Sequence, residues 1–264
     1  MTSRISTVFF DLGDTLWHFP SMPPAEVVRE ATISRITSLL EGWGFELTPG
    51  HALLGRYIKL DVEEATEQAF QGDCRDPGYP DVCRRVAARY GLELTLAQAE
   101  ELWDTWNLGG AFLGRVLFPD VLETLHWLRG EGYRLGSVTN RGWSGPRFQQ
   151  ELRDLGLAEL FEVVSVSCEI GYVKPHRLIY QDALGHLGIG PEEAVMVGDS
   201  LRGDIEGAQV LGMTAVWRRP LVGESVDETE DRPEALESVV PDYTIDTLSE
   251  LTGLPIFGES GSGK

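Results

Sequence analysis

The chain has 264 residues, of which 42% are hydrophobic, which is enough for one large domain or two smaller ones around a buried core. Its net charge of −20 gives a surface that repels nucleic acid and anionic membranes rather than binding them. The three cysteines have no CxxC spacing and no apolar stretch is long enough to cross a bilayer, so we expect a soluble, cytoplasmic protein without a disulfide framework.

The N-terminal part predicts one strand followed by a long helical segment. Residues 6–10 form a strand-like apolar run, and because it begins so early we expect no secretion signal. Residues 25–113 then read as helical, with a capping-box spacing at Thr95–Gln98. Trp103 and Trp106 are three residues apart and share a helix face, where we expect them to pack in a core.

The rest of the chain alternates between helices and strands. The expected helices are 119–131, 147–155, 176–187 and 204–211, and the expected strands are 134–138, 162–166, 194–197, 214–217 and 243–245. Such alternation predicts an α/β fold with a parallel sheet and right-handed crossovers. We therefore expect a core of residues 1–17 and 116–257, a helical insertion of residues 18–115 that acts as a lid, and a flexible tail at 258–264.

Polar residues follow several of these strands, at the edge where open parallel sheets bind ligands. Asp11 comes directly after the first strand, where a carboxylate can ligate a hard cation or act as a nucleophile. Asp199 and Asp204 follow another strand, and acids this close repel each other unless a cation lies among them. Because all these ligands are oxygens, Mg²⁺ suits the site best.

Three further residues predict a phosphate site at the same edge. The hydroxyl of Thr139 and the amide of Asn140 can hold phosphoryl oxygens. Lys174 can neutralise the charge of a phosphate beside Asp11, and it is noticeable because the chain has only three lysines.

These residues, in this order, resemble the haloacid dehalogenase superfamily with a type 1 helical cap. The segments that carry the resemblance are Phe10–Leu16 (FDLGDTL), Val197–Ala208 (VGDSLRGDIEGA) and Gly171–Pro175 (GYVKP) with Ile179-Tyr180. The resemblance covers the first 16 residues and about 116 to 251, and it implies a Rossmann-like parallel sheet core with an inserted α-helical cap domain.

The resemblance also implies a reaction, the hydrolysis of small phosphorylated metabolites through an aspartyl-phosphate on Asp11. It implies that Mg²⁺ is held by Asp11, by the backbone carbonyl of Gly13 and by Asp199, with Asp204 supporting the metal or its waters. Thr139 and Lys174 would hold the phosphoryl group.

One departure from the family pattern leaves alternatives open. The family's phosphatases carry a second Asp two residues after the nucleophile as general acid and base, and here that position is Gly13. Asp14, His18 or His176 are the candidates to replace it, and we place Asp14 first. The alternative functions are a dehalogenase, a phosphonatase that would use Lys59, and a low-activity phosphate-binding protein. The physiological substrate and the oligomeric state stay open.

Overall fold

The structure is a computed structural model that describes residues 5–220 and 239–257. The tail predicted at residues 258–264 lies outside this range. The chain divides into two compact units, Met1–His18 with Val116–Lys264, and Phe19–Arg115. His18 falls in the first unit because it pairs with Val116 in a short strand. The core and cap domains drawn from the sequence stay predictions.

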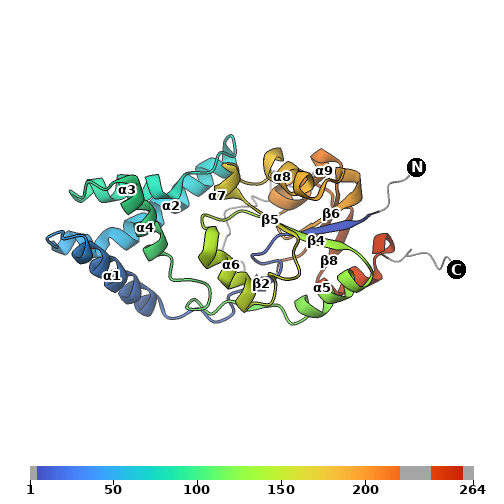
Figure 1. The fold of residues 1–264 in the computed structure, drawn as a ribbon, viewed down its shortest axis with the longest axis horizontal. Coiled ribbons are helices and arrows are strands. Elements are labelled where there is room, and N and C mark those ends of the chain that lie inside the picture. The colour runs from blue at the N-terminus through green and yellow to red at the C-terminus, as the bar shows by residue number, and fades with distance from the viewer. Residues whose placement is uncertain (1–4, 221–238, 258–264) are drawn as a thin grey trace. The chain divides into compact units, whose positions relative to one another are not determined.

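The first unit contains a six-stranded sheet whose strands are all parallel (Figure 1). The order is β5 (Val163–Val166), β4 (Arg134–Thr139), β1 (Thr7–Phe10), β6 (Ala194–Gly198), β7 (Thr214–Arg218) and β8 (Tyr243–Ile245). Strand β1 lies inside the sheet, and its residues Val8, Phe9 and Phe10 are wholly buried. A strand covered on both faces needs such a continuous apolar run. The α/β class predicted from the sequence is confirmed.

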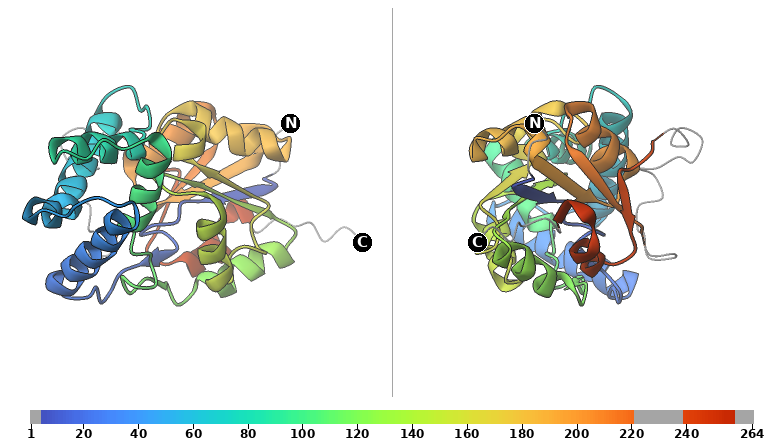
Figure 2. Two further views of the ribbon diagram at one scale, coloured as in Figure 1. Left: turned by 60° about the vertical axis from the view of Figure 1, so that its left-hand side comes forward. Right: turned by 90° about the vertical axis from the view of Figure 1, so that its right-hand side faces the viewer.

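Helices cover both faces of this sheet, with α5 and α6 on one face and α8 and α9 on the other (Figures 1 and 2). The helical elements of this unit are α5 (Val121–Gly130), α6 (Gly145–Asp154), α7 (Ser167–Ile170), α8 (Arg177–Leu187) and α9 (Gly207–Leu211), with the short turns η2 (Pro191–Glu193), η3 (Leu201–Glu206), η4 (Leu248–Gly253) and η5 (Pro255–Phe257). The helix expected at 204–211 is instead the π-helical turn η3 followed by α9.

A second, two-stranded sheet lies where the chain leaves the first unit and returns to it. Strand β2 (Trp17–His18) pairs antiparallel with β3 (Val116–Leu117). The amide of Phe118 also donates to the carbonyl of Leu16 at 3.0 Å. The two connections to the inserted segment are therefore held to each other by backbone hydrogen bonds.

The second unit, Phe19–Arg115, is built from helices. They are α1 (Ala25–Gly42), η1 (Pro49–Leu53), α2 (Leu54–Gln71), α3 (Tyr79–Arg89) and α4 (Leu96–Trp106). The predicted capping box is present at the start of α4, where the amide of Gln98 donates to the hydroxyl of Thr95. Trp103 stacks on Trp106 with ring centroids 5.2 Å apart, and Trp103 is buried. The predicted core packing is confirmed for Trp103, whereas Trp106 is partly exposed and its Nε1 donates to the carbonyl of Gly55 at 2.9 Å.

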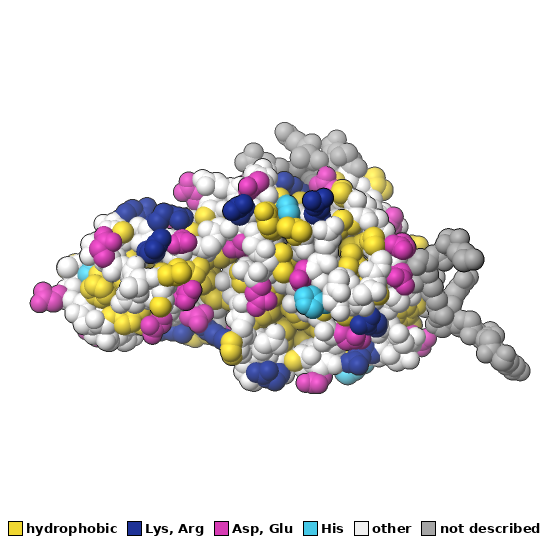
Figure 3. Space-filling model, turned by 45° about the horizontal axis from the view of Figure 1, so that its top comes forward, with side chains coloured by type: hydrophobic (Ala, Val, Ile, Leu, Met, Phe, Trp, Pro, Cys, Tyr) yellow, Lys and Arg dark blue, Asp and Glu magenta, His cyan; other side chains and the backbone are white. Residues whose placement is uncertain are grey.

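The surface mixes charges of both signs. Acidic and basic side chains are interspersed on the face shown in Figure 3. Among the residues that the structure describes, no helix has the length and apolar character needed to span a membrane.

Candidate active site

The predicted site residues meet at the carboxyl ends of neighbouring strands in the first unit. Asp11 follows β1, Thr139 ends β4 and Asp199 follows β6. The amide of Asp11 donates to the carbonyl of Val197 in β6 at 3.0 Å, which continues the pairing of the two strands to this edge. Parallel strands expose their carboxyl ends on one side, and the site is built there.

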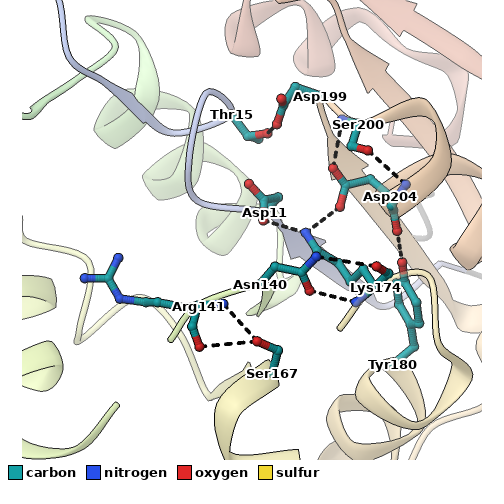
Figure 4. A network of polar contacts seen from close by, with 11 residues as sticks. Asp11, Thr15, Asn140, Arg141, Ser167, Lys174, Tyr180, Asp199, Ser200 and Asp204 are labelled. Carbon is teal, nitrogen blue, oxygen red and sulfur yellow. Dashed lines mark hydrogen bonds and ion pairs between the residues drawn. The ribbon is translucent and has the colours of Figure 1, made fainter. Parts of the chain in front are cut away.

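Three carboxylates converge at this edge (Figure 4). One oxygen from each of Asp11, Asp199 and Asp204 lies within 4.8 Å of the others. Asp11 and Asp204 are buried, with 8% and 1% of their surfaces exposed. Three carboxylates this close together, two of them buried, need positive charge among their oxygens, and an all-oxygen donor set fits Mg²⁺.

Lys174 lies between two of these acids. Its Nζ atom is 2.5 Å from Asp11 Oδ1 and 2.6 Å from Asp204 Oδ1, and the residue is almost fully buried. Burial opposes the charge of this ammonium, but the carboxylates of Asp11 and Asp204 outweigh it and hold the pKa of Lys174 above its ordinary value. Lys174 is therefore a permanent cation at the site.

The surroundings of Asp11 and Asp199 keep protons on them at unusually high pH. Burial is the largest cause and raises the pKa of Asp11 from 3.8 to about 7, against the opposing pull of Lys174. Burial and the negative charges of Asp11 and Asp204 also raise the pKa of Asp199. A cation that entered the cluster would favour the ionised carboxylates.

Asn140, predicted to bind substrate, contacts the backbone of Lys174. The Lys174 amide donates to Asn140 Oδ1 at 2.7 Å, and Asn140 Nδ2 donates to the Lys174 carbonyl at 3.5 Å. These contacts fix the segment that carries the lysine. Thr139 is buried one residue earlier, at the carboxyl end of β4, the neighbour of β1.

Asp204 is oriented by the turn that contains it. The amide of Ser200 donates to Asp204 Oδ2 at 3.0 Å, and the Ser200 hydroxyl accepts from the amide of Gly203 at 2.9 Å. Gly198 leaves the space that the Asp204 carboxyl group occupies, because a Cβ atom at residue 198 would overlap it. The predicted metal-supporting residue is thus held by its local sequence.

Asp199 is oriented by two residues for which the sequence suggested no role. The hydroxyl of Thr15 donates to Asp199 Oδ1 at 2.8 Å, and Trp217 Nε1 donates to the Asp199 carbonyl at 2.8 Å. Thr15 lies within the recognised segment Phe10–Leu16, and this was the only signal that could have found it. Trp217 had no comparable signal.

The loop after Asp11 turns sharply at Asp14. The φ angle of Asp14 is 50°, and its amide donates to the carbonyl of Trp17 at 2.8 Å. The segment is therefore not extended here, so the alternation of neighbouring side chains does not apply to residues 13 and 14. The Gly13 carbonyl, predicted as a metal ligand, accepts a hydrogen bond from the amide of Thr15 at 2.6 Å.

The candidates for the missing acid differ in their surroundings. Asp14 lies within electrostatic reach of Asp11, whose pKa is raised first by burial and further by the Asp14 charge. His18 stacks on Phe118 with ring centroids 4.2 Å apart, and His176 stacks on Tyr172 at 3.9 Å. That Asp14 replaces the missing acid stays a prediction.

Comparison with known proteins finds the same family that the sequence motifs resemble. A family model described as a haloacid dehalogenase-like hydrolase matches residues 5–212. A glyceraldehyde 3-phosphate phosphatase of Methanopyrus kandleri is 32% identical over 247 residues, which cover 94% of this chain and 95% of the relative. A ribulose-1,5-bisphosphate 5-phosphatase of Halopiger xanaduensis is 30% identical over 261 residues, which cover 94% of this chain and 98% of the relative.

Solved structures of the same fold include enzymes of two kinds. A HAD phosphatase from Thermococcus onnurineus is 27% identical with a TM-score of 0.53, covering 94% of this chain and 97% of that one. A 2-haloacid dehalogenase from Pseudomonas syringae pv. Tomato DC3000 is 26% identical with a TM-score of 0.59, with the same coverage of 94% and 97%. Since the family model matches most of the chain, in a range that includes the strand-end acids and the lysine, the chain belongs to the haloacid dehalogenase-like hydrolases.

Proposed function

We propose that this protein is a Mg²⁺-dependent hydrolase of small phosphate monoesters that works through an aspartyl-phosphate on Asp11. The observation that carries the proposal is the convergence of the oxygens of Asp11, Asp199 and Asp204 within 4.8 Å, with Lys174 Nζ at hydrogen-bond distance from two of them. A dehalogenase has no need of this set of acids, whereas phosphate chemistry uses both a cation and a lysine.

Asp11 is the nucleophile of the proposed reaction. Its carboxylate attacks phosphorus, and the bond to the leaving oxygen breaks. Lys174 offsets the negative charge of the incoming phosphate beside Asp11, and the hydroxyl of Thr139 donates a hydrogen bond to a phosphoryl oxygen. Bound Mg²⁺ would supply further neutralisation of the phosphoryl charge, held by Asp11, Asp199 and the Gly13 carbonyl with support from Asp204.

Asp14 is the general acid and base in this proposal. It protonates the departing alcohol and then activates the water that hydrolyses the aspartyl-phosphate. Its place in the turn and its electrostatic effect on Asp11 support the assignment. Asn140 positions Lys174 through its two hydrogen bonds to the backbone of that residue, and we propose that it also lines the phosphate site as predicted.

The substrate class follows from the relatives that cover nearly the whole chain. They are named as phosphatases of glyceraldehyde 3-phosphate and of ribulose 1,5-bisphosphate. Both are small phosphorylated carbohydrates, and we propose a substrate of this class. A cytoplasmic location stays a prediction from the sequence.

The test is phosphate release from glyceraldehyde 3-phosphate, ribulose 1,5-bisphosphate and p-nitrophenyl phosphate, with Mg²⁺ and with EDTA. We expect turnover that requires Mg²⁺ and disappears in Asp11→Asn. Asp154→Asn is the matched control, because Asp154 is exposed on α6. Halide release from a 2-haloacid in EDTA, without phosphate release from any ester, would instead support the dehalogenase.

A further inference from the structure

Arg218, the last residue of β7, reaches into the loop that follows the nucleophile. Its Nη1 atom donates to the carbonyl of Asp14 at 2.6 Å, across 204 positions of sequence. Arg218 is buried, with 3% of its surface exposed. Both residues belong to the first unit, and no part of the sequence pattern had singled Arg218 out.

This hydrogen bond acts on a residue with an unusual backbone. Asp14 has a φ angle of 50°, in the left-handed region that residues with a Cβ rarely adopt. Its amide is bonded to the Trp17 carbonyl and its own carbonyl to Arg218, so both backbone polar groups are held. Because the backbone sets where the Cβ points, these two bonds fix the Cα–Cβ direction of Asp14 and limit the staggered positions open to its carboxyl group.

The guanidinium of Arg218 is itself fixed in place. Its Cζ atom lies 3.8 Å from the centroid of the Phe118 ring, and that ring also stacks with His18 at 4.2 Å. A planar guanidinium packed on an aromatic face and buried keeps its hydrogen-bonding direction better than a flexible ammonium does. Arg218 is thus a rigid donor aimed at the turn.

Trp217, the residue before Arg218, makes the same kind of contact with the backbone of another acidic residue. Trp217 Nε1 donates to the carbonyl of Asp199 at 2.8 Å. The carboxyl end of β7 carries none of the predicted site residues, yet two successive side chains there hold the backbone of Asp14 and of Asp199. The end of this strand therefore supports the site without contributing a group to the chemistry.

We propose that Arg218 is a positioning residue that aims the Asp14 carboxyl group at the leaving oxygen. When the phosphorus–oxygen bond breaks, the bonding electron pair stays on the leaving oxygen, which takes the proton of Asp14. The inference rests on the proposed function, since it assigns a support to the acid of that reaction.

The test compares two esters that differ in how much they need an acid. The p-nitrophenolate group leaves p-nitrophenyl phosphate readily as an anion, whereas the glycerol oxygen of glycerol 3-phosphate needs a proton as it leaves. We would measure kcat/KM for both, because it includes departure of the leaving group, in Arg218→Met, Arg218→Lys and Asp14→Asn. Arg219→Met is the matched control, since the Arg219 side chain is 54% exposed in an ion pair with Asp246.

We expect Arg218→Met to lower kcat/KM on glycerol 3-phosphate about 10²-fold, the cost of a misplaced catalytic group. On p-nitrophenyl phosphate the loss should be less than about tenfold, because little acid assistance is needed. Arg218→Lys should show the same selectivity with a smaller loss. In the double variant with Asp14→Asn the two losses should not add, since both act on one proton transfer.

Equal losses on the two esters, or additive losses in the double variant, would overturn the positioning role. Thermal unfolding of each variant identifies any loss caused by unfolding, and Arg218→Lys supplies the comparison if Arg218→Met does not fold. A wild-type protein that hydrolyses neither of these esters, nor glyceraldehyde 3-phosphate or ribulose 1,5-bisphosphate, would refute the proposed function itself and this role with it. That failure is distinct, because it would be seen before any substitution is made.

Discussion

A carboxyl group placed at residue 13 should substitute for that of Asp14. The change is Gly13→Asp in an Asp14→Asn background, which moves the acid by one position along the turn. A Cβ atom at residue 13 would have only Trp17 Nε1 within 4 Å, at an ordinary contact distance of 3.9 Å. The φ angle of Gly13 is not in the left-handed region, so an Asp side chain fits there without backbone strain.

The size of the effect follows from the worth of a general acid. Such a group contributes about 10²–10⁴-fold to rate, which corresponds to about 2.7 to 5.4 kcal/mol of transition-state free energy. We expect Asp14→Asn to lose about 10²-fold on an alkyl phosphate, the lower end of that range. Gly13→Asp in that background should recover at least about tenfold, because the site has room for the side chain but was not shaped around it.

The assay is phosphate release from glycerol 3-phosphate at saturating Mg²⁺, with Gly13→Asn in the same background as control. Asn has the shape of Asp but no exchangeable carboxyl proton, so it should recover nothing. Equal recovery by Asp and Asn would show that bulk, rather than acid catalysis, is what residue 13 lacks. Full activity of Asp14→Asn on the alkyl phosphate would refute the assignment of Asp14.

Four further predictions concern the acid cluster. Lys174→Met leaves buried carboxylates uncompensated, so in EDTA at pH 8 denaturant unfolding should show a loss of about 3 kcal/mol, and unchanged stability would contradict the ion pairs. Gly198→Ala displaces the carboxyl group of Asp204, so the Mg²⁺ concentration for half-maximal activity should rise about 10–100-fold with the fold retained by circular dichroism. Burial raises the pKa of Asp11 from 3.8 to about 7, so this carboxyl group loses its proton at a lower pH in the unfolded chain than in the folded protein. The free energy of unfolding in EDTA should therefore fall as pH rises across that range. Calorimetric Mg²⁺ affinity should rise over the same range, about tenfold per pH unit, and a flat profile would exclude Asp11 as a ligand that must lose a proton.

The position of the site could be predicted because it depends on local patterns. Apolar runs that end in Asp11, Thr139 and Asp199 imply strands, and alternation with helices implies a parallel sheet. Parallel strands bring their carboxyl ends to one edge of the sheet, so these residues were expected at that edge, and they are close because β4 and β6 flank β1. The motif that contains Lys174 placed a cation at the same edge.

The supporting contacts could be learned only from the tertiary structure. Thr15 on Asp199, Asn140 on the backbone of Lys174 and Arg218 on Asp14 each join segments far apart in the chain. Such contacts depend on strand order and on the left-handed turn at Asp14, and neither of these produces a periodic pattern in the sequence. The residues proposed to carry the chemistry are therefore recognisable from sequence, whereas those that orient them are decided by which strands lie side by side.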